Sequence, residues 1–161
     1  MIIRSETEAD HDAIRAAITA AFGQGLEADL VDGLRADGDV VLSLVAAEGK
    51  GVSGHALFSR MDAPFRALGL GPVTVLPERQ RSGVGSALIR TGIEEARAQG
   101  WEAIFVLGEP DYYRRFGFDA ALAARFDCAY ASPYLMALAL RADLPAGGHV
   151  VYAPAFARLP Q

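Results

Sequence analysis

The sequence predicts a mixed α/β fold, in which helices cover a mostly antiparallel sheet that contains one parallel pair of strands. Three observations support this fold: two helical patterns near the start of the chain, a hairpin pattern after them, and a strand, helix, strand unit in the middle. A chain of 161 residues that is 52% hydrophobic can bury a substantial core. We therefore expect a single domain over residues 1–161.

The first part of the chain is predicted to form a short strand and two helices. Residues 1–5, MIIRS, fit a strand, and residues 7–10, TEAD, form a capping-box pattern typical of a helix start. The apolar face of the helix that follows comprises Ala13, Ile14, Ala17, Ile18 and Ala21. FGQG at 22–25 ends this helix, and apolar residues between Leu26 and Leu34 indicate a second helix that ends before Gly38.

Runs rich in β-forming residues make up the predicted sheet. Residues 42–61 contain two such runs around Glu48-Gly49-Lys50-Gly51, whose glycines suit a tight hairpin turn. Further strands are predicted at 68–76, 103–107 and 134–140.

An amphipathic helix separates the strands predicted at 68–76 and 103–107. Its apolar positions lie on one face: Val84, Leu88, Ile89, Gly92, Ile93 and Ala96. A helical crossover of this kind joins two parallel strands with a right-handed connection. The middle of the sheet should therefore contain the parallel pair.

The junction between strand and helix at residues 80–90, QRSGVGSALIR, contains two closely spaced glycines. The first N–H groups of a helix lack intrahelical partners and attract anions. Gly83 and Gly85 have no side chains that would keep a pyrophosphate from the backbone, and Arg79 and Arg81 add local positive charge. One interpretation of this junction is a binding site for a phosphate-bearing ligand, and the other is a simple strand-to-helix turn without a ligand.

Two common nucleotide-binding motifs do not fit this junction. A P-loop requires Lys followed by Ser or Thr after its second glycine, whereas Gly85 is followed by Ser86-Ala87. A dinucleotide fingerprint requires a third glycine where Leu88 stands.

Two blocks of the sequence together resemble a known family. Residues 73–89, VTVLPERQRSGVGSALI, resemble the acetyl-coenzyme A signature of the GNAT-type N-acetyltransferases, whose Gln/Arg-x-x-Gly-x-Gly/Ala motif matches residues 80–85. In EPDYYRRFGF, Tyr113 precedes Gly117-Phe118 by four residues, as in the second block of that family. The resemblance extends over essentially the whole chain and is most specific for the YhbS-like branch of predicted acetyltransferases.

The resemblance implies a GNAT-like acyl-CoA N-acyltransferase fold with acetyl-CoA as cosubstrate. The backbone of Val73 and Val75 would pair with the pantetheine arm of coenzyme A, where the strand that contains them splays from residues 103–107. Pro72 agrees with this, since proline marks a bulge or the end of strand pairing. The backbone amides that would bind the pyrophosphate belong to Arg81, Ser82, Gly83, Val84, Gly85 and Ser86.

The implied chemistry is direct attack of an amine on the acetyl group, with Tyr113 as the general acid that protonates the departing thiolate. Tyr112 should point elsewhere and is the weaker candidate. No general base stands out: His55 is a candidate if it faces the cleft, and Glu27 and Asp29 are candidates to orient a cationic amine. Many members of the superfamily carry an asparagine after the fifth strand, whereas this chain has Gly108-Glu109-Pro110.

Composition limits the partners and the compartment. A net charge of −5 opposes binding to nucleic acid, and no apolar run is long enough to cross a membrane. One cysteine, Cys128, cannot form an internal disulfide, which favours a cytoplasmic location. Three scattered histidines and one cysteine form no metal-binding pattern, so we expect no metal.

The sequence thus predicts an N-acetyltransferase that moves an acetyl group from acetyl-CoA to a primary amine. The acceptor, a small molecule or a peptide, is left open, as is the choice between monomer and homodimer. The alternative is a non-catalytic acyl-CoA-binding module that acts as a sensor or regulator.

Overall fold

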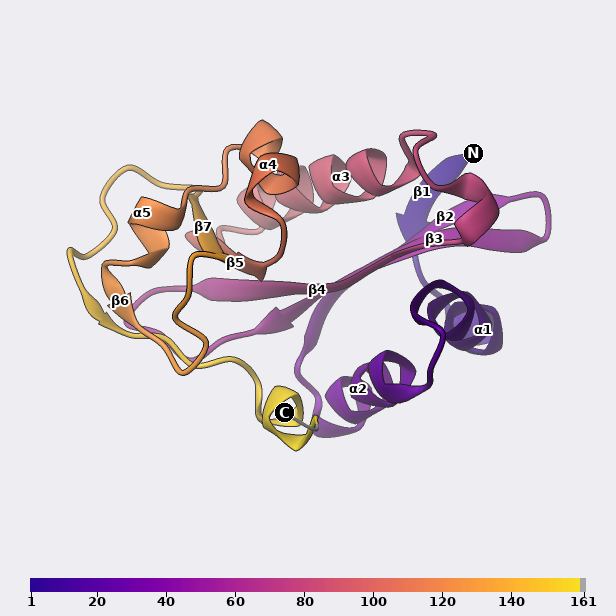
Figure 1. Cartoon of the computed structure of the whole chain (residues 1–161), viewed down its shortest axis with the longest axis horizontal. Helices are drawn as coiled ribbons and strands as arrows, with labels where there is room; N and C mark the ends of the chain where they lie inside the picture. The colour runs from indigo at the N-terminus through magenta and orange to yellow at the C-terminus, as the bar shows by residue number, and fades with distance from the viewer. Residues whose placement is uncertain (160–161) are drawn as a thin grey trace.

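A computed structural model describes residues 1–159, and its main feature is a six-stranded sheet with helices on both faces (Figure 1). The strand order is β1-β2-β3-β4-β5-β7. Helices α1 (His11–Phe22) and α2 (Leu26–Asp37) lie on one face, and α3 (Val84–Ala98) lies on the other. The predicted mixed α/β fold is confirmed.

The helices near the N-terminus begin and end where the sequence predicts. Strand β1 (Ile2–Ser5) leads into a short 3-10 helix, η1 (Glu8–Asp10), and then into α1. The capping box forms, since the carboxylate of Asp10 accepts a hydrogen bond of 2.7 Å from the backbone N–H of Thr7. Helix α2 ends at Gly38, whose φ of 76° is a conformation that residues with a side chain rarely adopt.

The predicted strands are present within a residue or two of their expected bounds. Strands β2 (Val40–Glu48) and β3 (Gly51–Arg60) form the hairpin, and β4 (Ala67–Val75) pairs antiparallel with β3. Strand β5 (Ala103–Leu107) pairs parallel with β4, and β7 (Leu135–Ala139) pairs antiparallel with β5. Helix α3 is the crossover that makes the parallel pair possible.

Strand β4 carries the irregularity predicted at Pro72. In the register with β3, Ala56 pairs with Val73 but Phe58 pairs with Leu70, so β4 has one extra residue between these pairs. The pairing of β4 with β5 ends at Leu70, opposite Val106. Beyond the bulge, β4 continues to Val75 along β3 alone, and the two parallel strands separate there.

Helix α3 packs on the sheet through two glycines that allow close approach. A Cβ atom at Gly92 would lie 2.2 Å from the ring of Phe58 on β3. A Cβ atom at Gly54 on β3 would lie 2.8 Å from Val84 and 3.0 Å from Leu88, at the start of the helix. The missing side chains therefore set the distance between α3 and β3 at both contacts.

The C-terminal third contains short elements that the sequence analysis did not predict. These are α4 (Pro110–Tyr113), η3 (Arg114–Phe116), α5 (Ala120–Ala123), β6 (Phe126–Asp127), β8 (Gly148–His149) and η4 (Pro154–Arg158). A further unpredicted element, the 3-10 helix η2 (Pro77–Arg79), precedes α3 in the middle of the chain. Strands β6 and β8 form a separate parallel pair. Helix η4 packs against α2.

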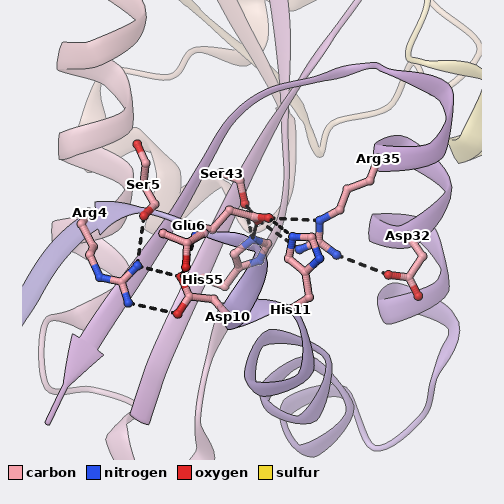
Figure 2. A network of polar contacts seen from close by, with 10 residues as sticks. Arg4, Ser5, Glu6, Asp10, His11, Asp32, Arg35, Ser43 and His55 are labelled. Atoms are coloured by element: carbon pink, nitrogen blue, oxygen red, sulfur yellow. Dashed lines mark hydrogen bonds and ion pairs between the residues drawn. The ribbon is translucent and has the colours of Figure 1, made fainter. Parts of the chain in front are cut away.

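A polar network joins β1, the first two helices and the β2–β3 hairpin (Figure 2). Its centre is Glu6, whose carboxylate accepts hydrogen bonds from Ser43 and from Arg35, at 3.0 Å from Nη2, and lies 2.7 Å from the ring of His11. His55 is fully buried beside it, with Nε2 2.7 Å from the hydroxyl of Ser43. The network thus fixes the N-terminal strand and helices to the sheet.

The network shifts the pKa values of its titratable groups. Burial alone would raise the pKa of Glu6, but hydrogen bonds from His55, Arg35 and Ser43 lower it by more, so the net pKa lies well below its usual range. Burial is the main cause that lowers the pKa of His55, although Glu6 acts in the opposite direction. His55 is therefore a neutral imidazole in the folded protein at pH 7.

Close packing at Gly92 predicts a stability effect. Alanine normally favours a helix over glycine by about 1 kcal/mol. At Gly92 the added methyl group would meet Phe58, and overpacking of this kind costs about 1–3 kcal/mol. We expect Gly92→Ala to lower the urea midpoint of unfolding.

A matched control is Gly33→Ala in α2, because a Cβ atom there meets its nearest neighbours at an ordinary 3.5 Å. That variant should unfold at the same or a higher urea concentration. A Gly92→Ala protein as stable as Gly33→Ala would contradict the described packing.

Buried His55 predicts a pH dependence of stability. Its folded pKa is lowered, so as the pH falls below about 6.5 the unfolded chain takes up a proton that the folded protein does not. The free energy of unfolding should therefore decrease from pH 7.5 to 5.5, with a slope of at most about 1.4 kcal/mol per pH unit from this group. His55→Gln should reduce the slope in urea titrations, whereas His149→Gln, at an exposed position, should leave it unchanged.

Candidate active site

The separation of β4 from β5 leaves one edge of β4 without a neighbouring strand. The N–H of Leu76 donates to the carbonyl of Ser53 on β3 at 2.9 Å, so the alternate residues Val73 and Val75 direct their backbone groups away from β3. The side-chain amide of Gln80 donates to the carbonyl of Val75 at 3.3 Å. This edge offers hydrogen bonds to an extended molecule between the strands.

The turn that precedes α3 directs backbone N–H groups toward the same region. Gly83 has a φ of 89° and caps the helix, and Arg81 also has a positive φ, of 65°. The first helical hydrogen bond runs from Ala87 N–H to the carbonyl of Gly83 at 3.0 Å, so the N–H groups of residues 84–86 precede the first helical bond. The predicted residues thus form a helix start with free N–H groups, which suits an anion.

A cavity of about 510 Å³, here called the glycine-turn cavity, lies between this helix start and the edge of β4. A Cβ atom at Gly85 would lie 3.0 Å from the hydroxyl of Tyr112 and 3.5 Å from Val75, so a side chain there would occupy the space. The cavity, the free N–H groups and the nearby cations together suit a diphosphate. Its lining residues are Val75, Gln80, Arg81, Gly83, Gly85, Ser86, Tyr112 and Arg115.

The positive charge at this cavity differs in part from the sequence prediction. Arg79 forms an ion pair with Glu48 at the end of β2, so its charge is already compensated. Arg81 lines the cavity as expected, and Arg115 lines it as well, with its guanidinium 4.6 Å from the ring centre of Tyr112. The sequence analysis missed Arg115, although the pair Arg114-Arg115 after two tyrosines was a visible signal.

A second cavity, of about 280 Å³ and here called the Tyr113 cavity, lies farther along the same edge of β4. A Cβ atom at Gly108 would lie 2.3 Å from the ring of Tyr113, so this ring rests directly on the backbone that follows β5. The lining residues come from α1, α2, β4, β5 and α4: Phe22, Glu27, Leu30, Leu70, Gly71, Pro72, Val73, Leu107 and Tyr113.

The two adjacent tyrosines separate the two cavities. Tyr112 lines the glycine-turn cavity and Tyr113 lines the other, with their ring centres 5.0 Å apart. Burial, together with the neighbouring Tyr112, raises the pKa of Tyr113 to about 12. Tyr113 therefore keeps its proton at neutral pH, which a general acid requires.

Of the other candidate residues, only some line a cavity in the described part of the chain. Glu27 lines the Tyr113 cavity, whereas Asp29 pairs with Arg15 at 2.8 Å. His55 lines neither cavity, because it is enclosed in the Glu6 network on the α1 side of the sheet. The idea that His55 faces the cleft is therefore wrong. Cys128 packs against the apolar cluster that contains Phe126, and it lines neither cavity.

The described residues contain neither a metal-binding cluster nor a helix suited to cross a membrane. Among residues 1–159, no group of three or more histidine, cysteine, aspartate or glutamate side chains is arranged to hold a metal ion. In the same range, the structure has no helix with both the length and the apolar character needed to cross a membrane.

Comparison with known proteins gives a consistent result. Residues 11–118 match the model of the acetyltransferase (GNAT) family. The uncharacterized N-acetyltransferase YjhQ of Escherichia coli strain K12 is 45% identical over 136 residues, which cover 79% of this chain and 72% of YjhQ. The uncharacterized N-acetyltransferase YhbS of the same strain is 36% identical over 131 residues, which cover 79% of this chain and 77% of YhbS.

Solved structures with the same fold contain the predicted cofactor. The structure of YhbS from Escherichia coli in complex with CoA has a TM-score of 0.91 and 30% identity, and the match covers 99% of this chain and 93% of that one. A GNAT family acetyltransferase from Brucella melitensis, in complex with acetyl-CoA, has a TM-score of 0.84 and 39% identity, with 96% and 97% of the chains covered. This chain belongs to the acetyltransferase (GNAT) family.

Proposed function

We propose that this protein, as a single domain, transfers an acetyl group from acetyl-CoA to a primary amine, with Tyr113 as the general acid. The observation that carries the proposal is the arrangement of two cavities along one unpaired strand edge. The glycine-turn cavity has the N–H groups and arginines that a diphosphate needs, and the Tyr113 cavity has a protonated phenol. The edge of β4 between them runs from Val75 to Val73.

The chain's own residues would hold acetyl-CoA by backbone contacts. The N–H groups of residues 81–86 would bind the pyrophosphate, with Arg81 and Arg115 compensating its charge. Val73 and Val75 would pair with the amides of the pantetheine arm, much as a neighbouring strand would. The thioester supplies the acetyl group that is transferred.

The chemistry requires one bond to form and one to break. The amine nitrogen bonds to the acetyl carbon, the carbon–sulfur bond breaks, and the phenol of Tyr113 gives its proton to the departing sulfur. The nitrogen loses one proton in the same reaction, so the products are an amide and coenzyme A thiol. The raised pKa of Tyr113 keeps the phenol protonated at neutral pH, so a proton is available when the sulfur departs.

The proposal also covers the cellular compartment, the acceptor and the oligomeric state. One cysteine in 161 residues supports a cytoplasmic site of action, where disulfides are rare. The small cavity beside Tyr113 supports a small molecule or the end of a peptide as acceptor. Either a monomer or a homodimer is compatible with a site built from one chain.

The proposed cofactor site predicts that side chains at the turn block binding. In the double variant Gly83→Val with Gly85→Val, one change opposes a φ of 89° and the other fills space beside Tyr112. We expect the Kd for acetyl-CoA, measured by calorimetry, to rise at least about tenfold, or about 1.4 kcal/mol.

The control for this prediction is Gly38→Ala, at the end of α2. Gly38 also has a positive φ, of 76°, but a Cβ atom there meets no other group within 4 Å and the residue lines neither cavity. It should cost stability and leave acetyl-CoA affinity unchanged. Equal affinity in the double variant and the wild type would place the diphosphate elsewhere.

The proposed acid predicts a specific kinetic defect. Tyr113→Phe removes the proton donor and keeps the ring on Gly108, so release of coenzyme A thiol should slow by about 10²-fold or more. The affinity for acetyl-CoA should stay the same. In contrast, Tyr112→Phe should change the KM for acetyl-CoA more than kcat, because its hydroxyl faces Gly85.

The same comparison tests the alternative of a non-catalytic sensor. Such a module would be stabilised by acetyl-CoA, and Tyr113→Phe would leave its behaviour unchanged. Absence of thiol release from the wild type across a broad amine panel, beside an active acetyltransferase as positive control, would contradict the enzyme proposal.

A further inference from the structure

The acidic residues of α2 are not equally free to bind a ligand. Arg15 pairs with both Asp29 and Asp32, at 2.8 and 2.7 Å. Among residues 1–159, Glu27 takes part in no ion pair, and its carboxylate instead accepts a hydrogen bond of 3.0 Å from the side-chain amide of Gln24. The carboxylate of Glu27 thus carries a negative charge that no cation among the described residues compensates, and the neutral side chain of Gln24 orients it.

This carboxylate lies in the wall of the Tyr113 cavity. Of the described residues that line the cavity, Glu27 and Tyr113 alone carry titratable side chains, and Tyr113 is neutral. The cavity therefore has a net negative charge, together with a proton donor for the leaving sulfur. A cation that enters it would meet no competing positive group among these lining residues.

The other walls are apolar and partly exposed. Phe22 is 43% exposed and Leu107 is 41% exposed, which are large values for residues of this kind. Both line the Tyr113 cavity, beside Leu30 and Pro72. Exposed apolar side chains at a cavity mouth are typical of a binding surface for an apolar group.

We infer that the acceptor is a monocationic primary amine on an apolar carbon body, and that Glu27 binds its ammonium group and takes the proton that the nitrogen must lose. This inference rests on the proposed acetyl transfer and specifies its substrate class. An N–H bond of the ammonium breaks, the proton moves to a carboxylate oxygen of Glu27, and the freed lone pair attacks the acetyl carbon. Glu27 returns the proton to water after the products leave.

The charge and size of the cavity define what is excluded. A carboxylate next to the amine, as in a free amino acid, would lie close to Glu27 and be repelled. A polyamine would place its second charge against Phe22 or Leu107, where no counter-charge lines the cavity. A volume of about 280 Å³ is below the usual range for ligand pockets, so it suits a small amine.

The experiment compares three amines with the purified wild-type protein: 2-phenylethylamine, phenylalanine and 1,4-diaminobutane. The expected kcat/KM for 2-phenylethylamine, from thiol release at saturating acetyl-CoA, exceeds each of the other two at least about tenfold. Glu27→Gln should lower kcat/KM for 2-phenylethylamine by about tenfold or more and reduce its advantage over phenylalanine. Asp29→Asn is the matched control, and it should keep the wild-type preference.

The pH profile separates proton transfer from a merely structural role. With Glu27 absent, only amine that is already neutral in solution can react, so kcat/KM of Glu27→Gln should keep rising with pH toward the pKa of the free amine. The wild-type profile should level off at lower pH. Glu27→Asp should restore part of the rate below that pKa.

A binding measurement keeps the inference testable if turnover is absent. Calorimetry of 2-phenylethylamine with protein saturated in coenzyme A should show binding to the wild type and to Asp29→Asn, and at least about tenfold weaker binding to Glu27→Gln. Acetylation of phenylalanine as fast as 2-phenylethylamine, or a Glu27→Gln protein that behaves as wild type, would overturn the inference and leave the acetyl transfer intact. If the amine binds in this Glu27-dependent way but is never acetylated, the proposed acetyl transfer is wrong, and so is the proton transfer to Glu27. The inferred preference of the cavity for a monocationic amine would still stand.

Discussion

The contact between Gly92 of α3 and the ring of Phe58 on β3 is the packing interaction on which the site depends. It brings the helix closer to the sheet than any residue with a side chain at position 92 would allow. Gly54 permits the same closeness at the other end, under Val84 and Leu88. Together the two contacts fix where α3 starts relative to β4, and hence where its free N–H groups point.

The site then arises from an interruption of regular structure. One extra residue in β4, near Pro72, coincides with the end of the β5 pairing at Leu70. The backbone beyond it keeps one hydrogen-bonding edge toward β3 and exposes the other. The helix start lies beside the far end of this edge, and Tyr113 lies beside the near end. A long thin ligand and a short reactive end can thus be held by different parts of one strand.

Local patterns predicted most of the fold because local interactions determine it. The capping box at Thr7, the left-handed Gly38 and the period of α3 are all visible in neighbouring residues. The short pair β6–β8 was missed, since two-residue strands leave no periodic signal. At the site, the sequence around Gly83 and Gly85 predicted the turn, but the proposed roles of Arg115 and Glu27 depend on which side chains are already paired elsewhere in the fold.

The unpaired edge of β4 also bears on aggregation. An open strand edge is a template on which a strand from another chain can add. Here the edge begins where the pairing with β5 ends at Leu70, and Gln80 already donates a hydrogen bond to the carbonyl of Val75. A polypeptide strand that added here would have to displace the side chain of Gln80 from that carbonyl. The contact that closes one carbonyl of this edge therefore also lowers its tendency to pair with a strand from another copy of the chain.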